Sequence, residues 1–274
     1  FSPCDLAPNR QQTYMVAGRP WTPRNANHSR YGQMVPLSWG LAQSNNWISA
    51  YLMSKLNPSQ FVQLLHDYGV NNPDIHASLS LCLGPCEVSV SEMVSAYTAF
   101  ANHGIRTAPM FVSRIEDNEG NTIATFQPRM NEVISADNAM KMLTMMMGVV
   151  DNGTAGRLRY RYKLEGQIGA KTGTTNNNSD GWFIAFTPQL VSGCWVGGED
   201  RDIHFDSMSM GQGATMALPI WAIFMKKVYA DVSLGYSPEV KFDIPADYNP
   251  CYHVGSGGEQ DSFEQVNAID EVFE

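Results

Sequence analysis

The sequence predicts an α+β fold in which a three-stranded antiparallel sheet is flanked by helices. Three strand-like segments follow one another closely at residues 169–175, 182–186 and 190–196, separated by an Asn-rich turn and a Pro-Gln turn. Segments on both sides instead repeat apolar residues with helical spacing. With 274 residues, of which 43% are hydrophobic, the chain can bury a sizeable core.

The region before the sheet is expected to be mainly helical after an irregular lead-in. The first 36 residues are rich in Pro, Asn, Arg and Gly and show neither helical nor strand periodicity, so they predict an extended segment. Helical spacing begins at Pro36, is interrupted at Ser44-Asn45-Asn46 and resumes to Leu56, which predicts a helix break with an N-cap. Further helices are expected from Pro58 to near Gly69, from Ser89 to His103 and from Ser135 to about Val150.

The remaining segments predict a hairpin, one more helix and a tail. Two strand-like runs between Phe111 and Phe126 flank Asp117-Asn-Glu-Gly120, which is typical of a hairpin. Pro219 is expected near the first turn of a helix with one apolar stripe that packs on the sheet. We expect residues 1–254 to form one domain portion, and residues 255–274, with six acids and no base, to form a solvated, mobile tail.

Composition argues against several classes of partner and cofactor. The net charge of −9 and the absence of a basic cluster disfavour nucleic acid. No apolar run reaches the roughly 18 residues that cross a bilayer, so membrane association is expected only through an anchor outside this chain. The six histidines lack paired metal-ligand spacing and no nucleotide loop is present, so we expect no metal and no cofactor.

The five cysteines leave two interpretations open. They stand at positions 4, 82, 86, 194 and 251 without a C-x-x-C motif. Cys82 and Cys86 could form a local disulfide if the intervening turn brings their Cα atoms within about 7 Å. The alternative is free, buried thiols, and it is favoured for Cys194 within its apolar strand.

Two short motifs carry the chemistry. Lys171-Thr172-Gly173-Thr174 joins an ammonium to two hydroxyls, and the missing Cβ of Gly173 lets a ligand backbone approach, which suits a ligand bearing a carboxylate. Ser44-x-Asn46 offers a hydroxyl for proton transfer and an amide that donates and accepts. Each motif alone is more often an ordinary exposed strand or a helix cap.

Together the two motifs match the second and third members of the set Ser-x-x-Lys, Ser-x-Asn and Lys-Thr-Gly found in penicillin-binding proteins and β-lactamases. Residues 20–230 resemble the transpeptidase domain of class A, bifunctional penicillin-binding proteins in order and spacing. The resemblance rests on Trp21-Thr-Pro-Arg-Asn25, Gly153-Thr-Ala-Gly156, Asp180-Gly-Trp-Phe183, Thr187-Pro188 and Trp195-Val-Gly-Gly198.

The chain departs from the family in lacking Ser-x-x-Lys, because none of its seven lysines has a serine three positions before it. The resemblance implies that this motif, with its nucleophilic serine, lies upstream of residue 1 and that the chain is the C-terminal part of the domain. The implied fold is a partial penicillin-binding protein and serine β-lactamase-like fold, with three of five strands and an uncovered apolar groove. Alone, such a chain is expected to be inactive.

The function that the resemblance implies is D,D-transpeptidation of peptidoglycan through a serine acyl-enzyme. The substrates are stem peptides ending in D-Ala-D-Ala, β-lactams act as inhibitors, and the reaction takes place on the periplasmic face of the bacterial inner membrane. Lys171, with the hydroxyls of Thr172 and Thr174, would hold the terminal carboxylate. Ser44 would relay a proton, Asn46 would hold the peptide amide, and the Thr174 N–H would contact the oxyanion.

Two other functions remain possible at this point. A D,D-carboxypeptidase or β-lactamase shares the motifs but transfers the acyl group to water, and the residues around Gly153 and Trp195 argue against it. A non-catalytic β-lactam sensor or scaffold would use the fold only for binding. A Ser-x-x-Lys motif upstream, after a glycosyltransferase domain, would distinguish the transpeptidase from both.

Overall fold

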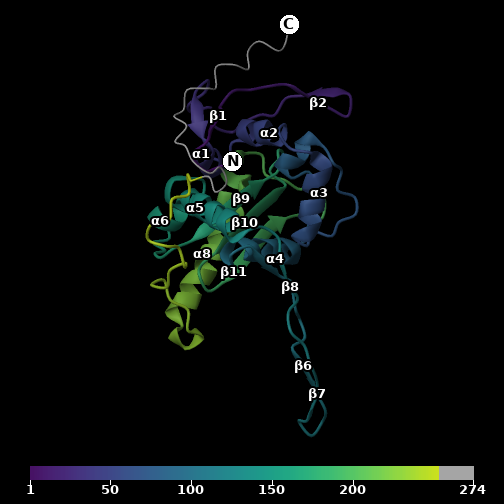
Figure 1. The fold of residues 1–274 in the computed structure, drawn as a ribbon, viewed down its shortest axis with the longest axis vertical. Helices are drawn as coiled ribbons and strands as arrows, with labels where there is room; N and C mark the ends of the chain where they lie inside the picture. The colour runs from purple at the N-terminus through teal and green to yellow at the C-terminus, as the bar shows by residue number, and fades with distance from the viewer. Residues whose placement is uncertain (253–274) are drawn as a thin grey trace, which may run out of the picture.

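A three-stranded antiparallel sheet forms the centre of the computed structural model, which describes residues 1–252 (Figure 1). Its strands are β9 (Gly169–Thr174), β10 (Asp180–Phe186) and β11 (Val191–Gly197), in the order β11-β10-β9. The predicted meander is therefore confirmed. Within the described residues β11 has only β10 as a neighbour, so its other edge carries no strand. The expected apolar groove beside the sheet stays a prediction.

Helices cover both faces of the sheet. On one face, α8 (Gly213–Ala230) packs against β10, where the rings of Phe183 and Trp221 meet edge to face. On the other face, α4 (Val90–Ala101) lies so close to β11 that a Cβ added to Gly193 would touch the Val94 side chain. Helix α5 (Ala136–Asn152) packs along β9. The helix predicted from Ser135 is thus confirmed, with Ser135 as its N-cap.

The position of Pro219 was predicted wrongly, because α8 begins six residues earlier and holds this proline in its interior. An interior proline removes a helical hydrogen bond, at a cost of about 3 kcal/mol. Packing of the first turns on the sheet offsets this cost. The added Cβ of Gly181 would touch Met216, and the Gly213 N–H donates to Thr174 Oγ1 at 3.0 Å.

The first 36 residues are not irregular, so the prediction of an extended, irregular lead-in is wrong. Strand β1 (Leu6–Pro8) pairs with β4 (Met34–Pro36), and β2 (Tyr14–Val16) pairs with β3 (Arg19–Trp21). Ala17 and Gly18 form the tight turn of the second pair, both with positive φ. Strands of three residues are too short for an alternating pattern to stand out in the sequence.

The helical region breaks where predicted. Helix α1 (Leu37–Ala42) ends before Ser44, and Asn45 caps α2 (Asn46–Met53) by accepting from the N–H groups of Trp47 and Ile48. The predicted helices after Pro58 and Ser89 are present as α3 (Pro58–Asp67) and α4. The shorter helical segments are α6 (Arg157–Tyr160), α7 (Met208–Gly211), η1 (Leu79–Leu83) and η2 (Val232–Leu234).

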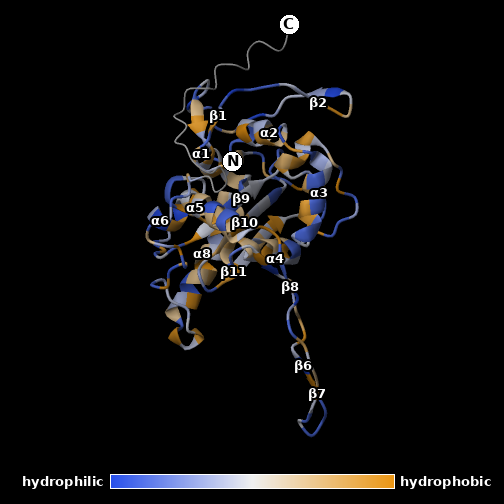
Figure 2. Ribbon diagram, in the orientation of Figure 1, coloured by the Kyte–Doolittle hydropathy of each residue, from blue (hydrophilic) through white to orange (hydrophobic). Residues whose placement is uncertain are grey.

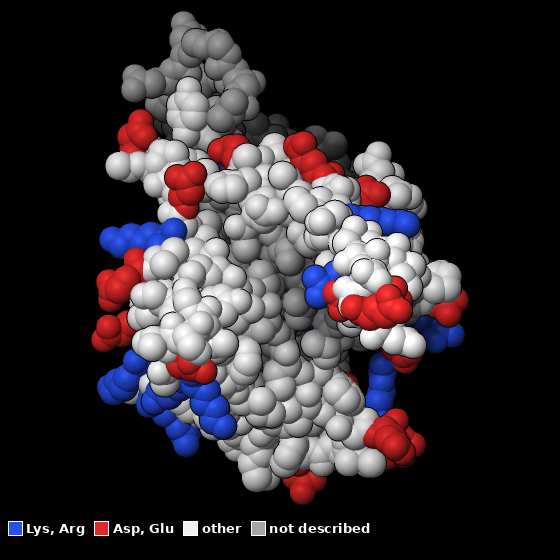
Figure 3. Space-filling model, turned by 90° about the horizontal axis from the view of Figure 1, so that it is seen from below, with Lys and Arg blue, Asp and Glu red and all other residues white. Residues whose placement is uncertain are grey.

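The predicted hairpin is confirmed and projects far from the body (Figure 1). Strands β6 (Arg114–Glu116) and β7 (Thr122–Thr125) extend beyond the pair β5 (Ile105–Thr107) and β8 (Met130–Glu132). Hydrophobic residues interrupt its polar surface (Figure 2), among them Phe111, which is 88% exposed. The face seen from below carries charges of both signs around an uncharged central furrow (Figure 3).

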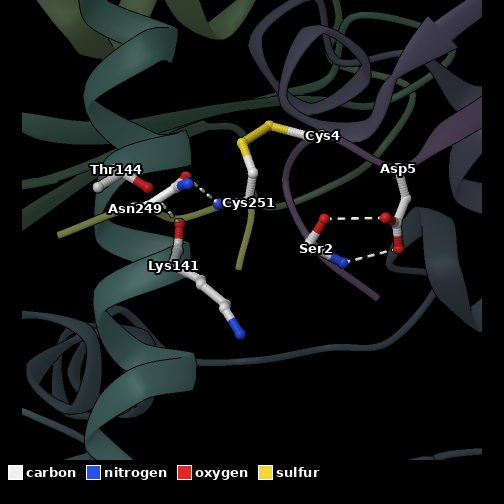
Figure 4. The surroundings of a disulfide bond; sticks show 7 residues. All are labelled: Ser2, Cys4, Asp5, Lys141, Thr144, Asn249 and Cys251. Atoms are coloured by element: carbon white, nitrogen blue, oxygen red, sulfur yellow. Dashed lines mark hydrogen bonds between the residues drawn. A yellow bond between two sulfur atoms is a disulfide. The ribbon is translucent and has the colours of Figure 1, made fainter. Parts of the chain in front are cut away.

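The structure distinguishes between the two interpretations of the cysteines and shows free thiols at Cys82 and Cys86. Cys4 and Cys251 form a disulfide with Cα atoms 5.3 Å apart, which joins the start of the chain to its C-terminal segment beside α5 (Figure 4). Cys82, Cys86 and Cys194 are free. Cys82 and Cys86 instead pack against a hydrophobic cluster, and burial raises the pKa of Cys82 to about 11. The predicted free thiol at Cys194 is confirmed.

Three further expectations concern the acidic tail, membrane spans and metal binding. The acidic tail, residues 255–274, lies outside the described residues. Within residues 1–252, no helix combines the length and the apolar character that a membrane span requires. The same residues hold no cluster of three or more His, Cys, Asp or Glu side chains suited to a metal ion.

Candidate functional site

The two sequence motifs meet in space. The Lys171 ammonium on β9 donates to Ser44 Oγ at 2.8 Å, although the two residues are 127 positions apart. It also donates to the carbonyl oxygen of Thr172 at 2.9 Å. The structure therefore brings the turn between α1 and α2 against the sheet strand, as a shared binding site requires.

Ser44 occupies an unusual backbone conformation. Its φ of 51° lies in the left-handed region, which is uncommon for residues other than glycine. The Ser44 N–H donates to Leu41 O and the Asn45 N–H to Gly40 O, so the end of α1 folds back on itself there. This turn exposes the Ser44 side chain and directs its hydroxyl to Lys171.

Asn46, the first residue of α2, is held by the lead-in. Its backbone N–H donates to Asn25 Oδ1 and its side-chain Nδ2 donates to the Arg24 carbonyl, both at 2.6 Å. These contacts orient the amide while its carbonyl oxygen and second Nδ2 hydrogen remain available to a ligand. Asn25, which accepts from the Asn46 N–H, was given no role by the motif reasoning.

The hydroxyls of β9 are engaged by neighbouring elements. Thr172 Oγ1 lies 2.8 Å from Thr154 Oγ1, and Thr174 Oγ1 accepts from the Gly213 N–H. Because that bond uses only a lone pair, the Thr174 hydroxyl hydrogen is free to be donated to an anion. A Cβ at Gly173 would lie 3.0 Å from the Trp182 Cβ, so glycine is also favoured there by strand packing.

Burial lowers the pKa of Lys171 but leaves its ammonium mainly charged at neutral pH. Removal of the ammonium from water lowers the pKa of Lys171 from 10.5 to about 8. At neutral pH the group is still mainly protonated, and none of the ion pairs among residues 1–252 involves it. A partly desolvated cation without a carboxylate partner is well suited to bind the carboxylate of a ligand.

Thr154 connects the two sides of the site and was not predicted as a site residue. Its N–H donates to Ala42 O at 3.0 Å, next to the Ser44 turn, while its hydroxyl contacts Thr172. Gly153 permits this approach, because a Cβ there would overlap the Ala42 carbonyl oxygen. The Gly153-Thr154 pair stood among the matching segments, which is the signal that could have identified it.

Comparison with known proteins identifies the family of the chain. Residues 6–193 match the family model of the penicillin-binding protein transpeptidase domain. The chain is 32% identical over 236 residues to penicillin-binding protein 1A of Aquifex aeolicus, covering 85% of this chain and 31% of that protein. For penicillin-binding protein 1A of Neisseria meningitidis the identity is 32% over 214 residues, covering 76% of this chain and 26% of that protein.

Solved structures show the same fold. Penicillin-binding protein 1A from Haemophilus influenzae superimposes with a TM-score of 0.79 at 24% identity, covering 89% of this chain and 41% of that one. PonA1 from Mycobacterium tuberculosis gives 0.71 at 22% identity, covering 92% of this chain and 67% of that one. The chain spans between about a quarter and a third of the length of the curated relatives it matches. It belongs to the penicillin-binding protein transpeptidase domain family.

Proposed function

We propose that the chain contributes the carboxylate-binding and proton-relay half of a peptidoglycan D,D-transpeptidase site. The observation that carries the proposal is the 2.8 Å contact between Lys171 Nζ and Ser44 Oγ, which unites the two motifs. A lysine with a pKa near 8 is mainly protonated at neutral pH and then provides positive charge for a carboxylate, and the hydroxyl beside it can pass a proton to a leaving amine.

The residues divide the work according to their positions. Lys171 and the hydroxyls of Thr172 and Thr174 bind the terminal carboxylate of a stem peptide ending in D-Ala-D-Ala, or that of a β-lactam. Asn46 orients the peptide amide, and Gly173 lets the substrate backbone approach β9. The backbone N–H of Thr174 donates to the oxyanion of the tetrahedral intermediate.

The reaction proceeds by two acyl transfers. A serine hydroxyl attacks the carbonyl carbon of the penultimate D-Ala and gives up its proton to a base, the amide bond breaks, and the departing D-Ala takes a proton relayed through Ser44. An amine of a neighbouring stem then attacks the ester carbonyl, the ester bond breaks, and the proton that the amine loses returns to the serine oxygen. This chain contains no Ser-x-x-Lys motif, so we propose that the nucleophile is supplied from outside it and that the chain alone is inactive.

The proposed location is the extracytoplasmic side of the bacterial inner membrane. The disulfide between Cys4 and Cys251 supports it, because such bonds persist in oxidising compartments. The proposed partners, which follow from the proposed transpeptidase function, are peptidoglycan stem peptides as substrates and β-lactams as inhibitors.

The test is intact-mass spectrometry after incubation with a fluorescent penicillin. The chain of residues 1–274 and the polypeptide encoded by the whole reading frame are compared, together with Ser44→Ala and Ser54→Ala in the latter. Ser54 is an exposed serine at the end of α2, away from Lys171, so its variant is the matched control. We expect an adduct only on the longer polypeptide, formed at least tenfold more slowly in Ser44→Ala.

Three outcomes would contradict parts of this proposal. An adduct on residues 1–274 alone would mean that the nucleophile is misplaced. No adduct on either polypeptide would indicate a binding module. In a parallel incubation of the longer polypeptide with a stem peptide ending in D-Ala-D-Ala, release of D-Ala without cross-linking would assign a hydrolase instead.

A further inference from the structure

Asn9 is a fully buried polar residue that has no part in the site described above. Its side-chain Nδ2 donates to the carbonyl oxygens of Ser29 and Arg30, at 2.9 and 2.8 Å. Its backbone N–H donates to Gln33 O, and its carbonyl accepts from Gly32 N–H. Four bonds thus fix Asn9 against the turn of residues 29–33, with only its side-chain oxygen left to serve another element.

That oxygen serves the turn that carries Ser44. Asn9 Oδ1 accepts from Asn45 Nδ2 at 2.8 Å, and the Asn45 side chain is 5% exposed. The Asn45 side-chain oxygen meanwhile caps α2, accepting from the N–H groups of Trp47 and Ile48 at 3.0 and 3.1 Å. Both polar atoms of the Asn45 side chain are therefore used, the oxygen to cap α2 and the nitrogen to bind the lead-in.

The link matters because Asn45 follows Ser44 directly. A left-handed conformation at a serine persists only where its surroundings determine it. The bonds of Ser44 and Asn45 to Leu41 and Gly40 tie the turn to α1, whereas the bond to Asn9 ties it to a different element. The first turn of α1 is itself anchored there, since Leu37 N–H donates to Asp5 O and Ser38 N–H to Pro3 O.

From this geometry we propose that Asn9 is a positioning residue that acts through Asn45 to hold the Ser44 hydroxyl at Lys171. The inference rests on the proposed function and deepens it. Displacement of a reacting group by about 1 Å can cost about a hundredfold in rate. Loss of the Asn9–Asn45 bond therefore slows proton relay, while carboxylate binding on β9, which neither asparagine contacts, is retained.

The test measures acylation by penicillin in the polypeptide encoded by the whole reading frame. Asn45→Ser keeps a capping oxygen but removes the Nδ2 that reaches Asn9. Asn57→Ser is the matched control, since Asn57 caps α3 through Ser59 and Gln60 in the same way, and no bond to a remote element accompanies that cap among the described residues. Asn9→Ala and the double variant with Asn45→Ser complete a double-mutant cycle.

Stopped-flow kinetics separate the acylation rate constant from the dissociation constant of the non-covalent complex. We expect Asn45→Ser to lower the acylation rate constant at least tenfold and to leave the dissociation constant within about twofold of that of the unmodified polypeptide. In Asn57→Ser both constants should stay within about twofold of the unmodified values. The double variant should be no slower than the slower single variant. All measurements are made well below the melting temperature of each variant, and Asn45→Ser decides alone if Asn9→Ala does not fold.

The outcomes are distinct. An unchanged rate constant in Asn45→Ser, or an equal fall in Asn57→Ser, overturns the positioning role. A raised dissociation constant in Asn45→Ser with an unchanged rate constant also overturns it, because the Asn9–Asn45 bond would then support binding of penicillin. Absence of acylation in the unmodified polypeptide contradicts the proposed function itself, and this inference with it.

Discussion

Thr154 and Thr172 share a hydrogen bond of 2.8 Å between their hydroxyls, and the same Thr154 donates its N–H to Ala42 O. One residue thus joins the strand that carries Lys171 to the helix that precedes Ser44. The distance between the two motifs is set by this bridge as well as by their direct contact.

The first prediction concerns the glycine that admits the bridge. Gly153→Ala places a methyl group against Ala42 O, and we expect it to lower the free energy of unfolding by about 1–3 kcal/mol. Gly148→Ala, in the middle of α5 with no atom within 4 Å of the added Cβ, should instead raise it by about 0.5–1 kcal/mol. Urea denaturation of both variants checks the pair, and equal effects would contradict the close approach.

The second prediction follows from the pKa of Lys171. The folded protein releases this proton near pH 8 and the unfolded chain near pH 10.5, so between these values the unfolded state binds more protons. The free energy of unfolding should therefore rise with pH across that window, relative to Lys171→Met, which has no such titration. NMR of ε-carbon-labelled lysine locates the midpoint directly. A difference between the two proteins that does not vary from pH 8 to 10.5 would refute the shift.

The third prediction compares two phenylalanines. Phe186 is fully buried at the end of β10, where its ring meets those of Tyr97 and Phe242 edge to face, so Phe186→Ala should cost about 3–5 kcal/mol. Phe111 at the base of the hairpin is 88% exposed, and Phe111→Ala should change stability by less than about 0.5 kcal/mol. Thermal unfolding measures both. A large loss at Phe111 would show that its ring is covered in solution.

The fourth prediction concerns the disulfide. Cys4 and Cys251 are 247 residues apart, and closing so long a loop restricts the unfolded chain strongly. Replacing both with Ser should cost about 2–5 kcal/mol. A reducing agent should lower the urea midpoint of the unmodified protein and leave that of the double variant unchanged. If the agent shifts neither midpoint, the bond does not stabilise the fold.

The sequence predicted the parts of the fold in which long segments repeat one pattern. The strand residues around Lys171 and the break at Ser44 belong to such segments, so the meander and the helix break could be anticipated, whereas the meeting of the two motifs was implied only by the family resemblance. The short strands of the lead-in and the Cys4–Cys251 pair could not, because neither leaves a periodic signal. The Asn9–Asn45 bond joins residues 36 positions apart through side chains alone, which spacing does not reveal.

The disulfide also holds two segments that are remote in the sequence at one place in the fold. Because the Cα atoms of Cys4 and Cys251 lie 5.3 Å apart, the lead-in before β1 and the segment that follows η2 are joined covalently beside α5. The two segments can therefore separate only when the bond is reduced, whatever happens to the hydrogen bonds of the lead-in.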